Sequence, residues 1–251
     1  MAQDLGFAEI GWTTGNSQGA KEAFIRWLAE GRHGPLAYMD NHKELRLHPE
    51  RLLEVPAAGF LVVVLPLARV ETKAADLPPG HAYVSRYARG RDYHRLMRHR
   101  LVKLLDEIKR TQPRIEGRAI VDSAPVLERD LAVQAGLGWI GKNSMFLTPQ
   151  WGSHVLLGSL ILSEKPEDLE PRQALADHCG SCRACLEACP TGAIQEGELM
   201  DASQCIVCWS IEEKTLPDVS KVQKWGSHFF GCDLCQDPCP WNRFADAPVE
   251  G

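Results

Sequence analysis

All nine cysteines of this 251-residue chain lie between Cys179 and Cys239. The run CGSCRACLEACP has the spacing CxxCxxCxxxCP, and GCDLCQDPCP adds a CxxCxxxCP run. The first spacing is typical of bacterial ferredoxins, in which three close cysteines hold one iron–sulfur cube and the fourth reaches a second cube. Paired CxxC units also bind zinc, but a tetrahedral zinc site does not need interlocked runs. The spacing therefore predicts two [4Fe–4S] clusters.

The same logic divides the cysteines into two sets of four and leaves one thiol over. We expect the first cluster to be held by Cys179, Cys182, Cys185 and the remote Cys239. We expect the second to be held by Cys189, Cys232, Cys235 and either Cys205 or Cys208.

A chain with clusters and nothing else would be an electron carrier. Here 178 residues precede the first cysteine, Cys179. A carrier has no obvious use for so large a domain, so we expect it to receive the electrons.

The elements before the cysteines indicate an α/β domain. Residues 59–67 (GFLVVVLPL) form a β-branched apolar run, typical of a strand buried on both faces of a parallel sheet. Residues 21–28 and 92–110 have helical patterns, and in the second of these the arginines 95 and 98 lie opposite the apolar residues. Residues 154–162 are expected to form another buried strand.

One carboxylate stands where such a sheet would bind a ligand. Residues 118–125 (RAIVDSAP) predict a strand that ends at Asp122, followed by a helix that Ser123 caps, with Pro125 in its first turn and its end near Val133. Ligands of open α/β sheets bind at the carboxyl ends of strands, which favours Asp122 as a functional residue. The alternative is that Asp122 only caps this helix.

The charged, proline-containing stretch 163–175 is the expected linker. We therefore predict two domains, an N-terminal α/β domain over residues 1–168 and a ferredoxin-like domain over residues 169–251.

Composition excludes few classes of protein. The formal net charge is −5, yet residues 86–118 carry eleven Lys and Arg against four Asp and Glu, a local excess that suits an RNA backbone or a solvated helix face. The sequence lacks a signal-peptide pattern and an apolar run of about 18 residues. We expect a cytoplasmic protein, not bound to membranes and monomeric, whose clustered cysteines ligate metal in a reducing compartment.

Six segments together resemble the epoxyqueuosine reductases. This family uses cobalamin and two [4Fe–4S] clusters to complete queuosine in the anticodon of certain tRNAs. The segments are YVSRYARGRDYH (83–94), VDSAPVLER (121–129), AGLGWIGKNS (135–144), GSHVLLG (152–158), CGSCRACLEACPTGAI (179–194) and GCDLCQDPCPWNR (231–243).

The resemblance implies a base-off corrinoid between the two domains, with Asp122 as the proton donor facing the cobalt. It implies as partners a tRNA anticodon carrying epoxyqueuosine, which also favours RNA for the basic segment, and an external low-potential electron donor. The cobalamin contacts that it implies are Asp122, Phe146, Leu157, Val207, Cys232 and Asp233.

Two departures from the family bear on these expectations. In CIVCWSIEE (205–213) the residue Cys208 stands where the family usually has a tyrosine, which favours Cys205 as the cluster ligand and Cys208 as a packed or redox-sensitive thiol. Members of the family also continue past the CPWNR motif into a helical-repeat domain that helps to hold the tRNA, whereas this sequence stops soon after it.

Two other functions remain as alternatives. A reductive dehalogenase pairs the same cofactors but typically carries a twin-arginine export signal. The other alternative is a ferredoxin-like electron carrier or a corrinoid-handling protein without tRNA activity.

Overall fold

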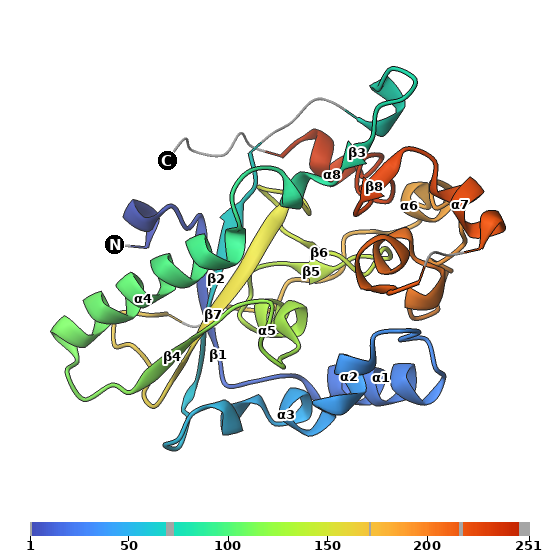
Figure 1. The fold of residues 1–251 in the computed structure, drawn as a ribbon. Helices are drawn as coiled ribbons and strands as arrows, with labels where there is room; N and C mark the ends of the chain where they lie inside the picture. The colour runs from blue at the N-terminus through green and yellow to red at the C-terminus, as the bar shows by residue number, and fades with distance from the viewer. Residues whose placement is uncertain (1, 69–72, 171, 216–217, 246–251) are drawn as a thin grey trace.

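The computed structural model describes residues 2–68, 73–170, 172–215 and 218–245. Its centre is a four-stranded sheet in the order β1-β2-β7-β4 (Figure 1). The strands are β1 (Glu9–Thr13), β2 (Gly59–Pro66), β7 (Val155–Leu162) and β4 (Gly117–Ile120). Every neighbouring pair is antiparallel. The mixed α/β class is confirmed, but the expected parallel sheet is wrong.

The apolar run of β2 reflects cover on both faces of the sheet. Leu61 and Val63 belong to one hydrophobic core, whereas Phe60 and Val62 belong to a second core on the opposite face. Successive residues of a strand point to opposite faces, so a strand that is covered twice needs apolar residues throughout. Such a run indicates two covered faces and does not determine strand direction.

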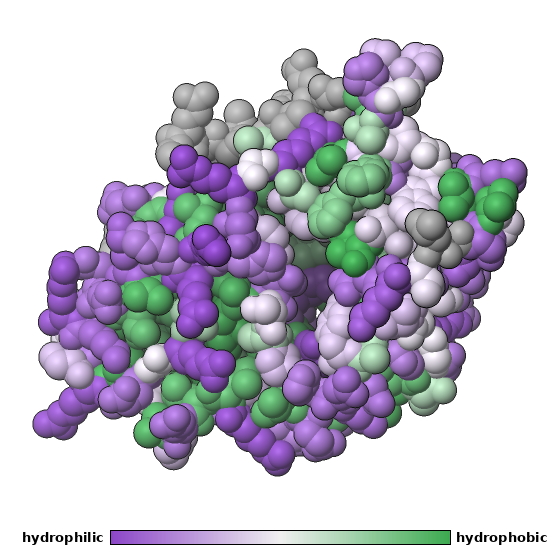
Figure 2. All heavy atoms as spheres, viewed as in Figure 1, coloured by the Kyte–Doolittle hydropathy of each residue, from purple (hydrophilic) through white to green (hydrophobic). Residues whose placement is uncertain are grey.

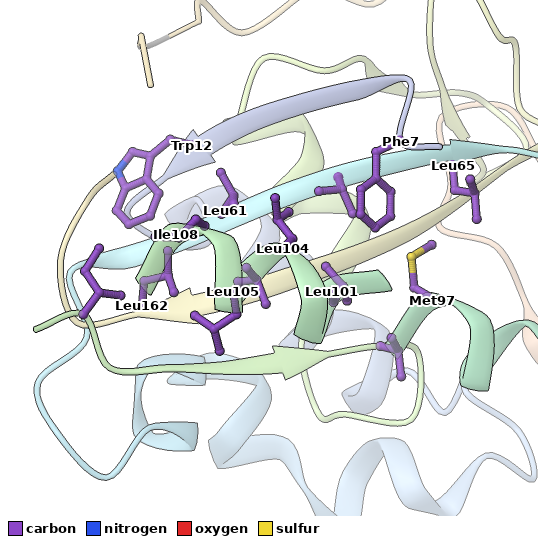
Figure 3. Packing of buried hydrophobic residues seen from close by; sticks show 14 residues of the cluster. Phe7, Trp12, Leu61, Leu65, Met97, Leu101, Leu104, Leu105, Ile108 and Leu162 are labelled. Carbon is purple, nitrogen blue, oxygen red and sulfur yellow. The ribbon is translucent and has the colours of Figure 1, made fainter. Parts of the chain in front are cut away.

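Helix α4 (Tyr93–Thr111) covers the first face. Its buried stripe packs on the sheet beside Trp12 and Phe7 (Figure 3) and consists of Met97, Leu101, Leu104, Leu105 and Ile108. The side chain of Asp92 caps the helix by accepting a hydrogen bond from the His94 backbone N–H. The helix predicted over 92–110 is therefore confirmed.

Helix α5 (Glu128–Gln134) covers the other face, where Leu131 and Ala132 join the second core. The helix begins after Leu127 without a side-chain cap, so the predicted start near Pro125 and the cap by Ser123 are wrong. Strand β4 also ends at Ile120, which leaves Asp122 in the turn between β4 and α5. Asp122 does not cap this helix, and its carboxylate is free for other partners.

The N-terminal helices are α1 (Gln18–Ala29), α2 (Ala37–Asn41) and α3 (Lys43–Leu47). A buried carboxylate, that of Asp130, joins α5 to the start of α1. Asp130 accepts hydrogen bonds from the backbone N–H of Ser17 at 2.7 Å, from the Ser17 hydroxyl at 2.9 Å and from the Asn16 amide at 3.1 Å. Ser17 in turn caps α1 by accepting from the Ala20 N–H. The start of α1 is thereby held against α5, and the helix predicted over 21–28 is confirmed.

The cysteine-bearing half contains only short elements. They are α6 (Ala184–Glu187), α7 (Val219–Trp225), β8 (His228–Phe230) and α8 (Pro240–Arg243). Strand β8 pairs in parallel with β3 (Tyr83–Val84) of the N-terminal half. A hairpin of β5 (Trp139–Ile140) and β6 (Phe146–Leu147) lies between the central sheet and this half in Figure 1.

Hydrogen bonds at several places join the halves, among them those of Asp233 and of Trp27. The carboxylate of Asp233, 1% exposed, accepts from the Tyr83 hydroxyl at 2.8 Å, the Ser85 hydroxyl at 2.6 Å and the Arg86 backbone N–H at 2.9 Å. On α1, the indole N–H of Trp27 donates to the carbonyl of Met200 at 2.7 Å. The two halves therefore share hydrogen bonds at both β3 and α1.

The described residues of the predicted linker, 163–175, contain no helix or strand. The domain boundary between residues 168 and 169 stays a prediction. Among the described residues, no helix is long and apolar enough to cross a membrane.

Replacing Asp130 with asparagine should lower the melting temperature, because an amide cannot accept all the donors from residues 16 and 17. The loss of about 1–3 kcal/mol corresponds to a decrease of roughly 2–10 °C, which calorimetry of the anaerobically reconstituted protein would measure. Asp106→Asn, at an exposed site on α4, is the matched control. Equal melting temperatures for the two variants would contradict this role of Asp130.

Candidate functional site

Asp122 lies in a turn where segments from both halves meet. Its side chain is 60% exposed, and its Oδ2 lies 3.3 Å from His94 Nε2. The Tyr93 hydroxyl also forms a hydrogen bond with Asp122. A carboxylate with a histidine and a phenol beside it, open to a ligand, is suited to proton transfer.

Three tyrosines surround this carboxylate. Burial, followed by the charge of Asp122, raises the pKa of Tyr93, and burial with the charges of Asp122, Glu212 and Asp233 raises the pKa of Tyr87 to about 12. Burial and nearby carboxylates raise the pKa of Tyr38 as well. The phenols therefore stay protonated at neutral pH and can act as hydrogen-bond donors.

Tyr87 connects Asp122 to the cysteine-bearing half. Its ring contacts Tyr93 edge to face, with centroids 6.1 Å apart, and lies 6.5 Å from the ring of Phe230. A Cβ on Gly231 would lie 3.3 Å from the Tyr87 ring and 2.6 Å from the Ser85 Cβ. The φ of Gly231 is +75°, so both space and backbone conformation favour glycine here.

Two charged residues near Asp122 carry buried polar atoms without partners. Arg46 is 7% exposed and donates weakly to the Val126 carbonyl at 3.4 Å, while its Nε has no partner among the described residues. Oε1 of Glu128 is likewise buried and unpartnered within the described part of the chain. Burial and then the charge of Asp122 raise the pKa of Glu128 to about 8. Buried polar atoms normally have partners, so these two mark a place for a polar ligand.

The other residues implied as cobalamin contacts lie on both sides of this region. Phe146 is buried in the β5–β6 hairpin, and Leu157 packs at the edge of the core beneath α5. Val207 immediately precedes Cys208, and Cys232 follows β8. Both carboxylate oxygens of Asp233 already accept hydrogen bonds from Tyr83, Ser85 and Arg86, so they are not available to a ligand.

The structure brings the first predicted set of cysteines together. The thiol of Cys185 has a raised pKa through burial and through the neighbouring charges of Cys179, Cys239 and Cys182. A cavity of about 390 Å³ touches all four thiol-bearing residues and is bordered by Leu147, Trp241, Phe244 and the aliphatic part of Lys142, among others. Four thiols around a largely apolar cavity fit an iron–sulfur cube.

The second set is grouped in the same way. Burial, followed by the charges of Cys232, Cys205 and Cys189, raises the pKa of the Cys235 thiol well above its usual range. Cys185 of the first set is a further neighbour of Cys235, so the two sets adjoin. Burial opposes ionisation of Cys189, but hydrogen bonds from Thr191 and the backbone N–H groups of Ala193 and Ile194 outweigh it and lower the pKa of this thiol. Such bonds to a ligating sulfur tune the potential of a cluster.

The leftover thiol, Cys208, is directed into a small hydrophobic cluster. It is 4% exposed and packs with Leu36 and Ala202. Burial and the charge of Cys205 raise the pKa of Cys208 to about 12. Cys205 is the one cysteine whose charge raises the pKa of Cys208 among the described residues. Cys205 itself also interacts with Cys189 and Cys235.

Several residues at this site were not predicted from the sequence, namely Tyr38, Arg46, Tyr87, Tyr93, His94 and Glu128. Three of them stand in YVSRYARGRDYH, where hydroxyl-bearing rings and a histidine are dense within twelve residues. This concentration of polar rings indicates a functional site and could have been used to predict one. Arg46 and Glu128 had no local signal, because their proximity to Asp122 arises only from the packing of α3 and α5.

Two family models match this chain. Residues 46–123 match the domain described as epoxyqueuosine reductase QueG, DUF1730, a segment that begins at Arg46 and ends just after Asp122. Residues 178–242 match the 4Fe-4S double cluster binding domain, which contains all nine cysteines. The prediction of a double [4Fe–4S] domain is thus confirmed.

Curated relatives match nearly the whole chain. The epoxyqueuosine reductase of Pseudomonas aeruginosa is 42% identical over 99% of this chain and 69% of its own length. The enzyme of Salmonella typhimurium is 40% identical over 98% of this chain and 64% of its own. The chain therefore spans about two thirds of the length of these relatives.

Solved structures of epoxyqueuosine reductases also superpose on this chain. An epoxyqueuosine reductase crystallised with a tRNA-Tyr epoxyqueuosine-modified stem loop superposes with a TM-score of 0.84 at 30% identity, over 98% of this chain and 64% of that chain. A catabolic reductive dehalogenase reaches a TM-score of 0.52 at 18% identity, which shows a shared fold alone. From the two domain matches and the near-complete alignment to these relatives, the chain belongs to the epoxyqueuosine reductase family.

Proposed function

We propose that this chain reduces the epoxide of epoxyqueuosine in a tRNA anticodon to the alkene of queuosine, using two [4Fe–4S] clusters and base-off cobalamin. The observation that carries the proposal is the placement of Asp122, which is exposed, hydrogen-bonded to His94 and Tyr93, and connected through Tyr87 to the cysteine-bearing half. The overall change consumes two electrons and two protons, and the epoxide oxygen leaves as water. A reductase therefore needs both an electron source and a proton donor at one place.

The residues present fit a corrinoid between the halves. Arg46 Nε and Glu128 Oε1 are buried without partners among the described residues and could be satisfied by the amide side chains of a corrin. Phe146, Leu157 and Val207 offer apolar surface for a flat macrocycle. When bound, cobalamin supplies a low-valent cobalt that delivers electrons to the epoxide carbon. Because the side chain of Asp233 is already engaged, we assign it to holding residues 83–86 in place.

Asp122 would supply the proton to the departing oxygen. The protonated phenols of Tyr38, Tyr87 and Tyr93 would orient its carboxyl group and the substrate through hydrogen bonds. A positioned proton donor of this kind contributes about 10²–10⁴ to a rate.

The clusters supply electrons singly. We assign the first to Cys179, Cys182, Cys185 and Cys239, and the second to Cys189, Cys205, Cys232 and Cys235. Both cysteines adjoin the cluster of Leu36 and Ala202. Cys205 is preferred to Cys208 because its thiol also neighbours the other members of the second set.

The exposed side of α4 suits the RNA backbone. Arg95 is 92% exposed, and Arg98 and Lys103 are exposed without an ion pair to any described residue. The surface over α4 is strongly hydrophilic in Figure 2. This side begins next to His94, so a phosphate chain bound along it would lead to Asp122. Positive side chains along such a path would add affinity that falls with salt.

We also propose that the protein acts as a monomer in the cytoplasm and takes electrons from an external low-potential donor. None of the nine cysteines forms a disulfide, which suits a reducing compartment.

Cys205→Ser should abolish the EPR signal of one of the two reduced clusters, whereas Cys208→Ser should preserve both signals. The physical reason is that a serine hydroxyl is a much poorer ligand for cluster iron than a thiolate, whereas Cys208 packs in a hydrophobic cluster. Iron content measured on the same samples provides an independent check. Loss of a cluster in the Cys208 variant alone would instead identify Cys208 as the ligand.

Asp122→Asn should preserve binding of cob(II)alamin but lower turnover on epoxyqueuosine-modified tRNA by about 10²–10⁴. EPR of anaerobic protein before and after reduction reports the base-off cobalt and both clusters, and mass spectrometry of the anticodon nucleoside reports turnover. Asp106→Asn on the exposed side of α4 is the control for charge. Clusters without a bound cobalt signal in the parent protein would instead support an electron carrier.

Replacing Arg95, Arg98 and Lys103 together with alanine should weaken binding of the tRNA anticodon stem loop. The slope of log affinity against log salt should become shallower by about 2–3, because up to three phosphate contacts are lost. Alanine at Arg26, Arg51 and Lys214 removes the same charge elsewhere and serves as the control. An unchanged slope in the α4 variant would contradict this docking surface.

A further inference from the structure

We infer that His94 reloads Asp122 with protons from solvent, and that Asp92 orients the His94 ring for this task. The inference rests on the proposed function in one respect, since it takes Asp122 as the proton donor. The hydrogen-bonded chain Asp92–His94–Asp122 runs from the start of α4 to the turn after β4, and His94 is its proton carrier.

The hydrogen bonds of His94 form a continuous path. Its Nδ1 lies 2.8 Å from Asp92 Oδ1, and its Nε2 lies 3.3 Å from Asp122 Oδ2. The same Asp92 oxygen accepts the His94 backbone N–H at 3.0 Å, which fixes the carboxylate relative to the ring. The ring of Tyr93 stacks on that of His94 with centroids 4.0 Å apart. The imidazole is thus held on two edges and on one face.

The charge at Asp92 determines which ring nitrogen faces the active site. Hydrogen bonds from the His94 side chain and backbone lower the pKa of Asp92, so this residue remains a carboxylate and accepts the proton on Nδ1. Nε2 is then left to take up a proton and to donate it to Asp122. This division of roles is the usual one for a histidine between a carboxylate and a reacting group.

Atom balance requires a supply of this kind. Removing the epoxide oxygen as water uses two protons in every turnover, and the carboxyl group of Asp122 holds only one. Asp122 must therefore be protonated again, or a second donor must act. The side chains of His94 and Asp92 are 41% and 53% exposed, and that of Asp122 is 60% exposed. Once a tRNA anticodon covers Asp122, His94 is the contact through which protons from solvent reach it.

The other titratable groups around Asp122 are less suited to this task. Tyr87 and Tyr93 have raised pKa values and do not exchange protons readily at neutral pH. Arg46 on α3 remains charged, and Tyr38 on α2 has a raised pKa. Glu128 on α5, with a pKa of about 8, holds a proton at neutral pH, but its buried Oε1 lacks a hydrogen bond to any described group. Glu128 is therefore the competing donor that an experiment must test.

The test is a time-resolved infrared measurement on the protein loaded with clusters and cobalamin and bound to the product, an anticodon stem loop carrying queuosine, so that the otherwise exposed Asp122 is covered. A caged acid lowers the pH, and the carboxyl band of Asp122, identified by its loss in Asp122→Asn, reports the rate of protonation. We expect His94→Asn and His94→Gln to slow this rate about 100-fold, and added imidazole to restore part of it. Asp92→Asn should slow it less, because the ring remains but loses its orientation.

Two variants make the measurement decisive. His99→Gln changes another exposed histidine of α4 and should leave the rate unchanged, while Glu128→Gln tests the competing donor. An unchanged rate in both His94 variants, or a loss confined to Glu128→Gln, would overturn the inference. EPR of the cobalt and clusters in each variant verifies that the site has formed.

This readout is separate from the proposed function. If Asp122→Asn still turned over modified tRNA, the assignment of Asp122 as donor would fail while the infrared rate could still depend on His94. If turnover required Asp122 but the infrared rate did not depend on His94, only the role of His94 would fail.

Discussion

The buried carboxylate of Asp233 is the interaction on which the arrangement of the site depends. A charge that is 1% exposed is costly unless donors surround it, and here all the donors from the N-terminal half come from residues 83–86. These bonds place β3 beside β8 and hold Tyr87 against Gly231. The cysteines and the proton-carrying side chains around Asp122 are thereby brought together at the junction of the two halves.

The two halves contribute different chemistry at this junction. The cysteine-bearing half consists of short turns that direct thiols inward, and hydrogen bonds from backbone N–H groups reach sulfurs such as that of Cys189. The sheet half is closely packed, with α4 and α5 on its two faces. This packing matters because His94 lies in the first turn of α4 and Asp122 lies in the turn that leads to α5.

Burial gives the polar groups around Asp122 distinct roles. The phenols of Tyr87 and Tyr93 are kept protonated, Glu128 has a raised pKa, and Asp92, at the surface, is kept ionised by its hydrogen bonds to His94. Groups that share one small region thus differ in protonation at neutral pH. Environments that separate pKa values in this way are characteristic of sites where protons move.

The sequence by itself determined the features that depend on local spacing. The cysteine runs indicated two clusters, and the stripe from Met97 to Ile108 indicated α4, because ligand spacing and helical periodicity are properties of consecutive residues. The choice between Cys205 and Cys208 remained open in the spacing, and it depends on which thiol lies beside Cys189, Cys232 and Cys235. The antiparallel sheet, the turn that frees Asp122 from helix capping, and the proximity of Arg46, His94 and Glu128 to it were decided only by tertiary structure. They depend on how the helices and strands pack together, mostly through residues far apart in the chain, and no local pattern records that packing.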